Sequence, residues 1–179
     1  MRNAVGREIP DEILRATGKE VFAGSYAHDD RCYQKAAPKA HGVCDPHRSK
    51  LVSGIREVLE RCGIRDGMTL SFHHHFREGD YVLNRVMEEV HSMGVRNITL
   101  CATSLGKAND PIVPLIEDGT ITKIYSSGVR GSIGEAISTG KLRELAVMYS
   151  HGGRVRSVQE GSVHIDIAFI GAPTADEYG

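Results

Sequence analysis

Short apolar runs alternate with segments of helical periodicity along most of this sequence. The apolar runs, each of strand length, cover residues 68–72, 97–102, 121–125, 145–149 and 165–171. Between them, apolar residues recur every three or four positions, which predicts helices over 80–94, 111–117, 132–138 and a short one after residue 150. Strands that are apolar throughout and separated by helices are typical of a parallel sheet covered on both faces. We therefore predict an α/β fold, Rossmann-like and doubly wound, with a mainly parallel sheet.

A further helix is predicted ahead of the first strand. Asp45 is a suitable N-cap, and Pro46 is favoured in the first turn because its missing N–H group is not needed there. Gly63 suits the left-handed position that ends many helices. The helical spacing between these ends comes from Leu51, Ile55, Val58, Leu59 and Cys62.

Residues 1–44 differ from the rest, because they mix charges, glycine and proline with only short apolar pieces. We predict an N-terminal arm that packs on another element or is partly irregular, with one short helix near 11–16. The predicted organisation is therefore an arm over 1–44 and one α/β domain over 45–179.

Composition and charge exclude several classes of function. A net charge of -1 provides no attraction to nucleic acid or to an acidic membrane, and the absence of Trp disfavours a base-stacking surface. No apolar run approaches the roughly 18 residues that span a bilayer, and residues 1–10 lack the apolar region of a secretory signal. None of the four cysteines forms a C-x-x-C pair, so metal binding by them is disfavoured.

Polar residues follow each predicted strand, where ligands of open α/β sheets bind. The first strand leads into His73, His74 and His75, with Arg77 close behind. Neutral or charged imidazole suits the recognition of carboxylates or proton transfer, but the run is also compatible with structural hydrogen bonds, or with a metal site that His151 completes.

Arginines and glycines follow the later strands. Arg77, Arg130 and Arg154 fit an anionic ligand, because a guanidinium group binds a carboxylate or phosphate through two parallel hydrogen bonds. Any one of them alone is more readily a solvated loop charge, and it is their shared place after predicted strands that favours an anion site. Glycines that lie close together after a strand have two readings. Their backbone N–H groups stabilise a thioester or carboxylate oxygen, or the glycines mark only a sharp turn. The glycines in question are Gly128, Gly131, Gly152 and Gly153. No G-x-G-x-x-G, P-loop or G-x-S-x-G pattern is present.

Four segments together resemble the citrate lyase alpha subunit family, and the stretch 131–140 is similar to the wider CoA-transferase superfamily. The segments are 67–74 with Gly79 and Asp80, 124–131, 150–155, and 165–169 with 176–179. The resemblance implies a transferase that exchanges citrate for the acetyl group of an acetylated acyl carrier protein. The products are the citryl carrier, which a lyase subunit then cleaves, and acetate.

The resemblance also implies partners and a location. We expect no metal and no tightly bound cofactor, because the thioester is carried on a CoA-like prosthetic group of the acyl carrier (gamma) subunit, with a lyase (beta) subunit in the same cytoplasmic complex. Expected contacts with citrate and the thioester come from nine residues. They are His73, His74, Arg77, Ser126, Gly128, Arg130, His151, Gly152 and Gly153.

Alpha subunits of this family are expected to contain two α/β halves, of which this chain resembles the first. The catalytic acidic residue of CoA-transferases lies in the second half, so the resemblance assigns no catalytic residue here and implies that the chain is inactive alone. Two alternatives stay open: a non-catalytic module that binds or senses a small anion, and a metal-dependent lyase built on the histidine run.

Overall fold

The computed structural model describes residues 1–24, 47–73 and 81–178. The chain divides into two compact units, Met1–Gln34 and Lys35–Gly179, and each is described by itself. The boundary predicted near residue 44 lies outside the described residues, so it stays a prediction.

The N-terminal unit contains the short helix that the sequence predicts, α1 (Asp11–Thr17). The helix ends at Gly18, which adopts the left-handed conformation (φ 63°) and donates its N–H to the Leu14 carbonyl at 2.9 Å. A bridge between Arg2 and Glu8 precedes it. None of the residues of α1 is buried, so the helix contributes no core.

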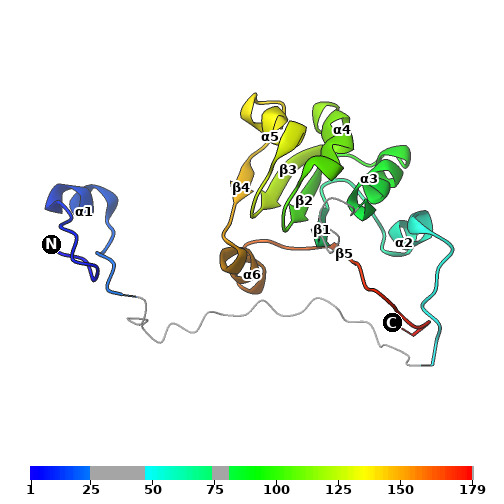
Figure 1. Ribbon diagram of the computed structural model, residues 1–179, viewed down its shortest axis with the longest axis horizontal. Coiled ribbons are helices and arrows are strands. Elements are labelled where there is room, and N and C mark those ends of the chain that lie inside the picture. Colours follow the sequence, from blue (N-terminus) through cyan, green and yellow to red (C-terminus); the bar gives the residue numbers. More distant parts are fainter. Residues whose placement is uncertain (25–46, 74–80, 179) are drawn as a thin grey trace. The chain divides into compact units, whose positions relative to one another are not determined.

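The second unit is built on a five-stranded parallel sheet, as predicted (Figure 1). The strand order is β4-β3-β2-β1-β5. The strands are β1 (Thr69–His73), β2 (Ile98–Ala102), β3 (Ile121–Ser126), β4 (Ala146–Met148) and β5 (Ile167–Ile170). Each coincides with one of the predicted apolar runs.

Helices connect successive strands. They are α2 (Ile55–Arg61) ahead of β1, α3 (Val82–Ser92), the 3₁₀ helix η2 (Lys107–Ile112), α4 (Val113–Glu117), α5 (Gly131–Ser138) and α6 (His151–Gln159). The chain steps from β1 to β4 in one direction across the sheet and then returns past β1 to β5. Because parallel crossovers are right-handed, α3, α4 and α5 cover one face, and α6, on the return, lies on the other. The predicted doubly wound arrangement is confirmed.

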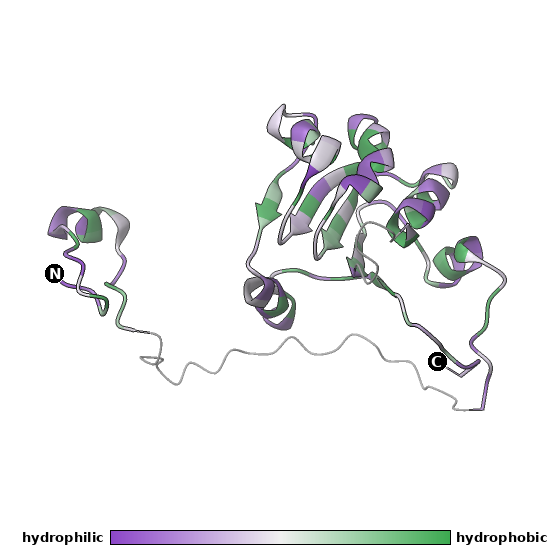
Figure 2. Ribbon diagram, in the orientation of Figure 1, coloured by the Kyte–Doolittle hydropathy of each residue, from purple (hydrophilic) through white to green (hydrophobic). Residues whose placement is uncertain are grey.

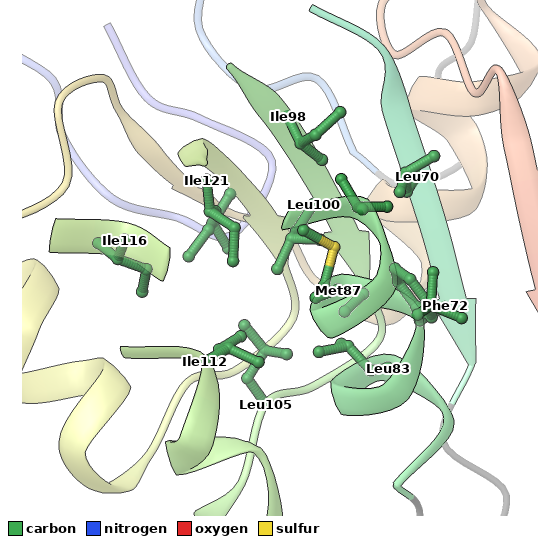
Figure 3. Packing of buried hydrophobic residues seen from close by; sticks show 14 of the residues in the cluster. Leu70, Phe72, Leu83, Met87, Ile98, Leu100, Leu105, Ile112, Ile116 and Ile121 are labelled. Atoms are coloured by element: carbon green, nitrogen blue, oxygen red, sulfur yellow. The ribbon is translucent and has the colours of Figure 1, made fainter. Parts of the chain in front are cut away.

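The core lies between the sheet and the helices α3, η2, α4 and α5. Leu70, Leu100 and Ile124 point to this face, which we call the core face, from three adjacent strands, and all are fully buried. Leu83 and Met87 of α3 pack against them, together with Ile112 and Ile116 (Figure 3). Figure 2 shows hydrophobic residues along the strands and mainly hydrophilic ones along α6.

The opposite face, which we call the α6 face, carries the alternate residues of the strands. The register pairs Ser71 of β1 with Cys101 of β2, and Cys101 with Tyr125 of β3. Since side chains alternate along a strand, all three point away from the core face. Hydroxyl and thiol groups therefore replace the aliphatic side chains of the core face. The α6 face is thus the face of the sheet that can contribute polar groups to a binding site.

Helix α2 begins later than predicted. Residues 47–54 are not helical, and Asp45 and Pro46 lie outside the described residues. The Ser53 N–H and hydroxyl both donate to Glu57, at 2.7 and 2.6 Å, which stabilises the first turn from Ile55 onward. Leu51 is 69% exposed, so its position in the apolar pattern does not belong to the helix.

Candidate functional site

The carboxyl edge of the sheet contains a topological switch point between β3 and β4. The chain leaves β3 toward α5 on the core face and leaves β4 toward α6 on the other face. Ligands of open α/β sheets bind where adjacent strands send their connections to opposite faces. The loop after β3 and the first turn of α6 are therefore the elements that define the candidate site.

The loop after β3 is closed by the hydroxyl of Ser126. This residue is fully buried, and its Oγ donates to the Gly128 carbonyl (3.0 Å) while accepting the Gly128 N–H (3.2 Å). The Arg130 N–H donates to the Leu105 carbonyl at 2.9 Å, which joins this loop to the one after β2. The Arg130 residue is exposed and directly precedes α5. Ser126 thus holds the loop, whereas Arg130 is available to a ligand.

An acidic residue occupies the start of α5. Asp110 accepts the Ser132 N–H at 3.0 Å and the Ser132 hydroxyl at 3.1 Å. Gly131 adopts φ 66°, and a Cβ there would lie 2.7 Å from Asp110 Oδ1. The carboxylate of Asp110 therefore satisfies the α5 N-terminus in place of a ligand anion.

Residues His151, Gly152 and Gly153 form the first turn of α6 rather than a turn ahead of a helix. Ser150 is the N-cap, and its Oγ accepts the Gly153 N–H at 3.0 Å. The Gly153 N–H is thus used within the helix. His151 and Gly152 are exposed, so they are the members of this turn that face solvent.

Arg154 of α6 reaches across the α6 face of the sheet. Its Nη2 donates to the Cys101 carbonyl (3.0 Å) and to Ser71 Oγ (3.2 Å). Burial raises the pKa of the Cys101 thiol above its ordinary value of 9.0, and the neighbouring guanidinium of Arg154 only partly opposes this. The thiol is therefore protonated at neutral pH and is not a nucleophile.

The predicted site residues fall into three groups. Ser126, Gly128 and Arg130 belong to the loop after β3, and His151–Gly153 to the start of α6, so the switch point brings these two groups to neighbouring strands. His73 ends β1, which β2 separates from β3. His74 and Arg77 lie outside the described residues.

Two residues near the candidate site are absent from the set that the sequence predicts. Asp110 directly precedes the helix predicted over 111–117 and is not among the predicted site residues, yet it holds the α5 N-terminus. Tyr149, predicted as the last residue of a strand, instead follows β4. The centroid of its ring lies 6.0 Å from that of Tyr125, which belongs to the α6 face. The alternation of side chains from Tyr125 onward would have indicated that face, whereas no local signal pairs residues 110 and 132.

Fold and site define a doubly wound α/β protein whose candidate binding residues gather at the carboxyl edge of a parallel sheet. The sequence model of the family described as citrate lyase, alpha subunit (CitF), matches residues 48–179. The chain belongs to the citrate lyase alpha subunit family.

Individual relatives agree with this assignment. The chain is 48% identical over 151 residues to a citrate lyase alpha chain of Escherichia coli, covering 84% of this chain and 30% of the relative. It is 46% identical over 153 residues to that of Haemophilus influenzae, covering 85% and 31%. The alpha chain of Klebsiella pneumoniae is 42% identical over 171 residues, covering 96% and 32%.

A solved structure resembles the chain over nearly its whole length. It is described as an alpha subunit of citrate lyase in complex with citrate from Streptococcus mutans, with a TM-score of 0.80 and 40% identity. The match covers 99% of this chain and 34% of that one. The chain therefore spans about a third of the length of the relatives it matches. Among its described residues, no helix is long and apolar enough to cross a membrane.

Proposed function

We propose that this chain is the portion of a citrate lyase alpha chain that binds citrate and the acyl thioester. In the overall exchange, citrate replaces acetate on the carrier thioester, giving the citryl carrier and free acetate. The observation that carries the proposal is that a chain of this family has exposed hydrogen-bond donors at the switch point between β3 and β4. The similarity to a citrate-bound Streptococcus mutans protein supports citrate as the ligand.

The exposed donors at the switch point suit a tricarboxylate. Carboxylates only accept hydrogen bonds when ionised, and the Arg130 guanidinium offers two parallel donors to such a group. His151 adds an imidazole at the N-terminus of α6, where the helix dipole favours negative charge. Arg130 follows β3 and His151 follows β4, which are neighbouring strands, so the proposal places citrate between these two residues.

Other parts of the machinery lie beyond these residues. We assign the thioester to a CoA-like prosthetic group on an acyl carrier subunit, and cleavage of the citryl group to a separate lyase subunit. The acidic residue that attacks the thioester is assigned to the remainder of an alpha chain. No tightly bound cofactor or metal is required of this chain in the proposal.

Citrate binding tests the role of Arg130. We expect Arg130→Gln to weaken citrate binding to this chain by about tenfold or more, because a hydrogen-bonded charge pair is lost. Arg85→Gln is the control, since Arg85 is an exposed arginine of α3 that pairs with Glu88 at 2.9 Å and does not follow β3 or β4. Calorimetric titration of both variants checks this, and equal affinities would contradict the proposal.

Reconstitution tests the transfer reaction. The chain alone is expected to leave acetyl carrier and citrate unchanged, and addition of the remaining part of an alpha chain to yield citryl carrier and acetate. Mass spectrometry of the carrier distinguishes the two acyl groups. Citrate binding without any transfer after reconstitution would instead support a non-catalytic anion-binding module.

A further inference from the structure

Three buried polar atoms have no hydrogen-bond partner among the described residues. They are Thr103 Oγ1, Ser127 Oγ and Arg154 Nε. Burial of a polar atom without a partner costs folding free energy, so native proteins retain few of them. A cluster of such atoms therefore calls for a reason other than stability.

All three atoms lie on the α6 face at the carboxyl edge of the sheet. The ladder pairs Ala102 with Ser126, and the next residues continue it, since the Ser127 N–H donates to the Thr103 carbonyl at 3.0 Å. Thr103 and Ser127 are thus neighbours that point to the face opposite the core. Arg154 reaches the same face from α6, where its Nη2 contacts Cys101, two residues before Thr103. The three side chains therefore border one region.

The half-buried guanidinium of Arg154 is held by neutral groups only. Its hydrogen bonds go to the Ser71 hydroxyl and the Cys101 carbonyl, and it forms no ion pair within the part of the chain that the structure describes. Burying a cation is costly unless an anion pairs with it. Arg154 and Ser127 are both partly exposed, so this region lies within reach of a ligand from solvent.

We propose that Thr103, Ser127 and Arg154 form a binding site for an oxyanion, either a carboxylate or a phosphate. The Nε–H group only donates, and both hydroxyls donate to an acceptor, so the three groups match a ligand oxygen with several lone pairs. The site rests on the proposed function, because it adds contacts on the α6 side of the switch point. Citrate supplies the carboxylate, and a CoA-type group supplies the phosphate.

Removal of the two hydroxyls separates binding from stability. Thr103→Val and Ser127→Ala are expected to weaken ligand binding by about tenfold each, because each removes one hydrogen bond to a charged group. Both are expected to leave the melting temperature unchanged or raised, since an unpartnered polar atom is deleted. Thr103 is only 9% exposed, so valine of similar shape fits its place.

Thr122→Val is the matched control. Thr122 is also buried on the sheet, but its hydroxyl donates to Glu144 Oε1 at 2.9 Å. The same substitution there is expected to lower the melting temperature and leave affinity unchanged. Arg154→Gln is compared with Arg156→Gln on the same helix, because Arg156 pairs with Glu160; only the first is expected to lose binding.

Separate calorimetric titrations with citrate and with CoA identify the source of the oxyanion. Weaker binding of either compound to the Thr103 and Ser127 variants supports the site and names its ligand. Unchanged binding of both compounds overturns the site while leaving the proposed function intact. Absence of binding to the unsubstituted chain overturns both the site and the proposed function. A lower melting temperature of the Thr103 and Ser127 variants with unchanged affinity overturns the site alone.

Discussion

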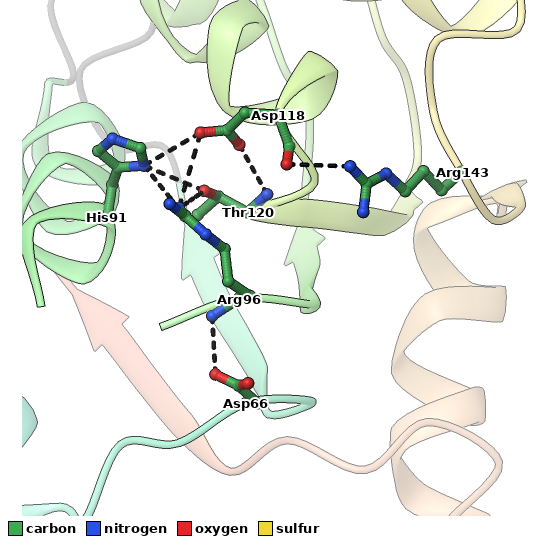
Figure 4. A network of polar contacts seen from close by, with 6 residues as sticks. All are labelled: Asp66, His91, Arg96, Asp118, Thr120 and Arg143. Carbon is green, nitrogen blue, oxygen red and sulfur yellow. Dashed lines mark hydrogen bonds and ion pairs between the residues drawn. The ribbon is translucent and has the colours of Figure 1, made fainter. Parts of the chain in front are cut away.

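The carboxylate of Asp118 organises a polar network at the amino edge of the sheet (Figure 4). It accepts the Thr120 N–H at 2.8 Å and faces His91 Nδ1 at 3.2 Å and Arg96 Nη1 at 3.6 Å. Burial acts to raise the pKa of Asp118, but the hydrogen bonds from Thr120 and the charges of Arg96 and His91 outweigh it and lower the pKa. This edge is opposite the candidate site, so the network serves stability.

The lowered pKa of Asp118 makes part of the stability depend on pH. A carboxyl group whose folded pKa is depressed stabilises the fold above its unfolded pKa, and this contribution is lost as pH falls through the folded pKa. We expect Asp118→Asn to reduce the free energy of unfolding by about 1 kcal/mol at pH 7, since the group is partly exposed. The difference from the unsubstituted chain shrinks as pH falls below 3.8, the ordinary pKa.

Urea unfolding at pH 7 and pH 3 measures this effect. Glu88→Gln provides the comparison, because Glu88 forms an exposed surface pair with Arg85 and should change stability by less than about 0.5 kcal/mol. A difference between Asp118→Asn and the unsubstituted chain that is equal at both pH values would contradict the assignment.

Gly131 is the glycine of the candidate site whose conformation requires glycine. Its φ of 66° is unfavourable for other residues, and a Cβ would lie 2.7 Å from Asp110 Oδ1. We expect Gly131→Ala to lower the free energy of unfolding by about 1–2 kcal/mol. Gly128→Ala, with open space around the new methyl group, should be nearly neutral. Thermal unfolding of the pair checks this, and equal losses would rule out strain at Gly131.

At the scale of elements, the sequence predicts the type and order of the helices and strands better than their first and last residues. The buried positions of α3, among them Leu83 and Met87, follow directly from their spacing, because a helix buries one face. The start of α2 depends instead on the bonds from Ser53 to Glu57, which no periodicity reveals. Periodicity reports what an element buries, whereas its ends depend on a few capping atoms.

For the candidate site, the sequence predicts the edge of the sheet on which it lies but not which loops are neighbours there. Parallel strands place all their following loops at one edge, so the polar segments after the strands were expected there. Which loops are neighbours depends on the strand order, which puts β4 beside β3 and β1 two strands away from β3. Thr103 and Ser127 each follow a predicted strand, but nothing local in the sequence pairs them, because the register that makes them neighbours is a property of the assembled sheet.

The N-cap of α6 links local structure to the candidate site. Ser150 accepts the Gly153 N–H, and the helix it starts carries both His151 and Arg154. We expect Ser150→Ala to cost about 1 kcal/mol and to speed amide hydrogen exchange in the first turn of α6. Ser138→Ala, at the exposed end of α5, should do neither. Unaltered exchange in α6 would show that Ser150 does not stabilise the helix start.

At the scale of the whole α/β unit, stability and binding occupy different surfaces. The core face and the amino edge hold the aliphatic cluster and the Asp118 network. The carboxyl edge and the α6 face hold the exposed Arg130 and His151 and the unpartnered atoms of Thr103, Ser127 and Arg154. A parallel sheet permits this division, because its core tolerates polar loops at one edge without exposing the strands.

This division predicts that core variants lose stability without losing affinity. Met87 is fully buried against the sheet, so Met87→Ala leaves a cavity and is expected to lower the free energy of unfolding by about 2–5 kcal/mol. Met148→Ala is the matched control, because Met148 is 49% exposed on the edge strand β4 and should cost far less. Citrate titration below the melting temperature should give both variants the affinity of the unsubstituted chain. A selective loss of affinity in Met87→Ala would mean that the core face and the carboxyl edge are coupled, because the loss of a core side chain would then have displaced the binding loops.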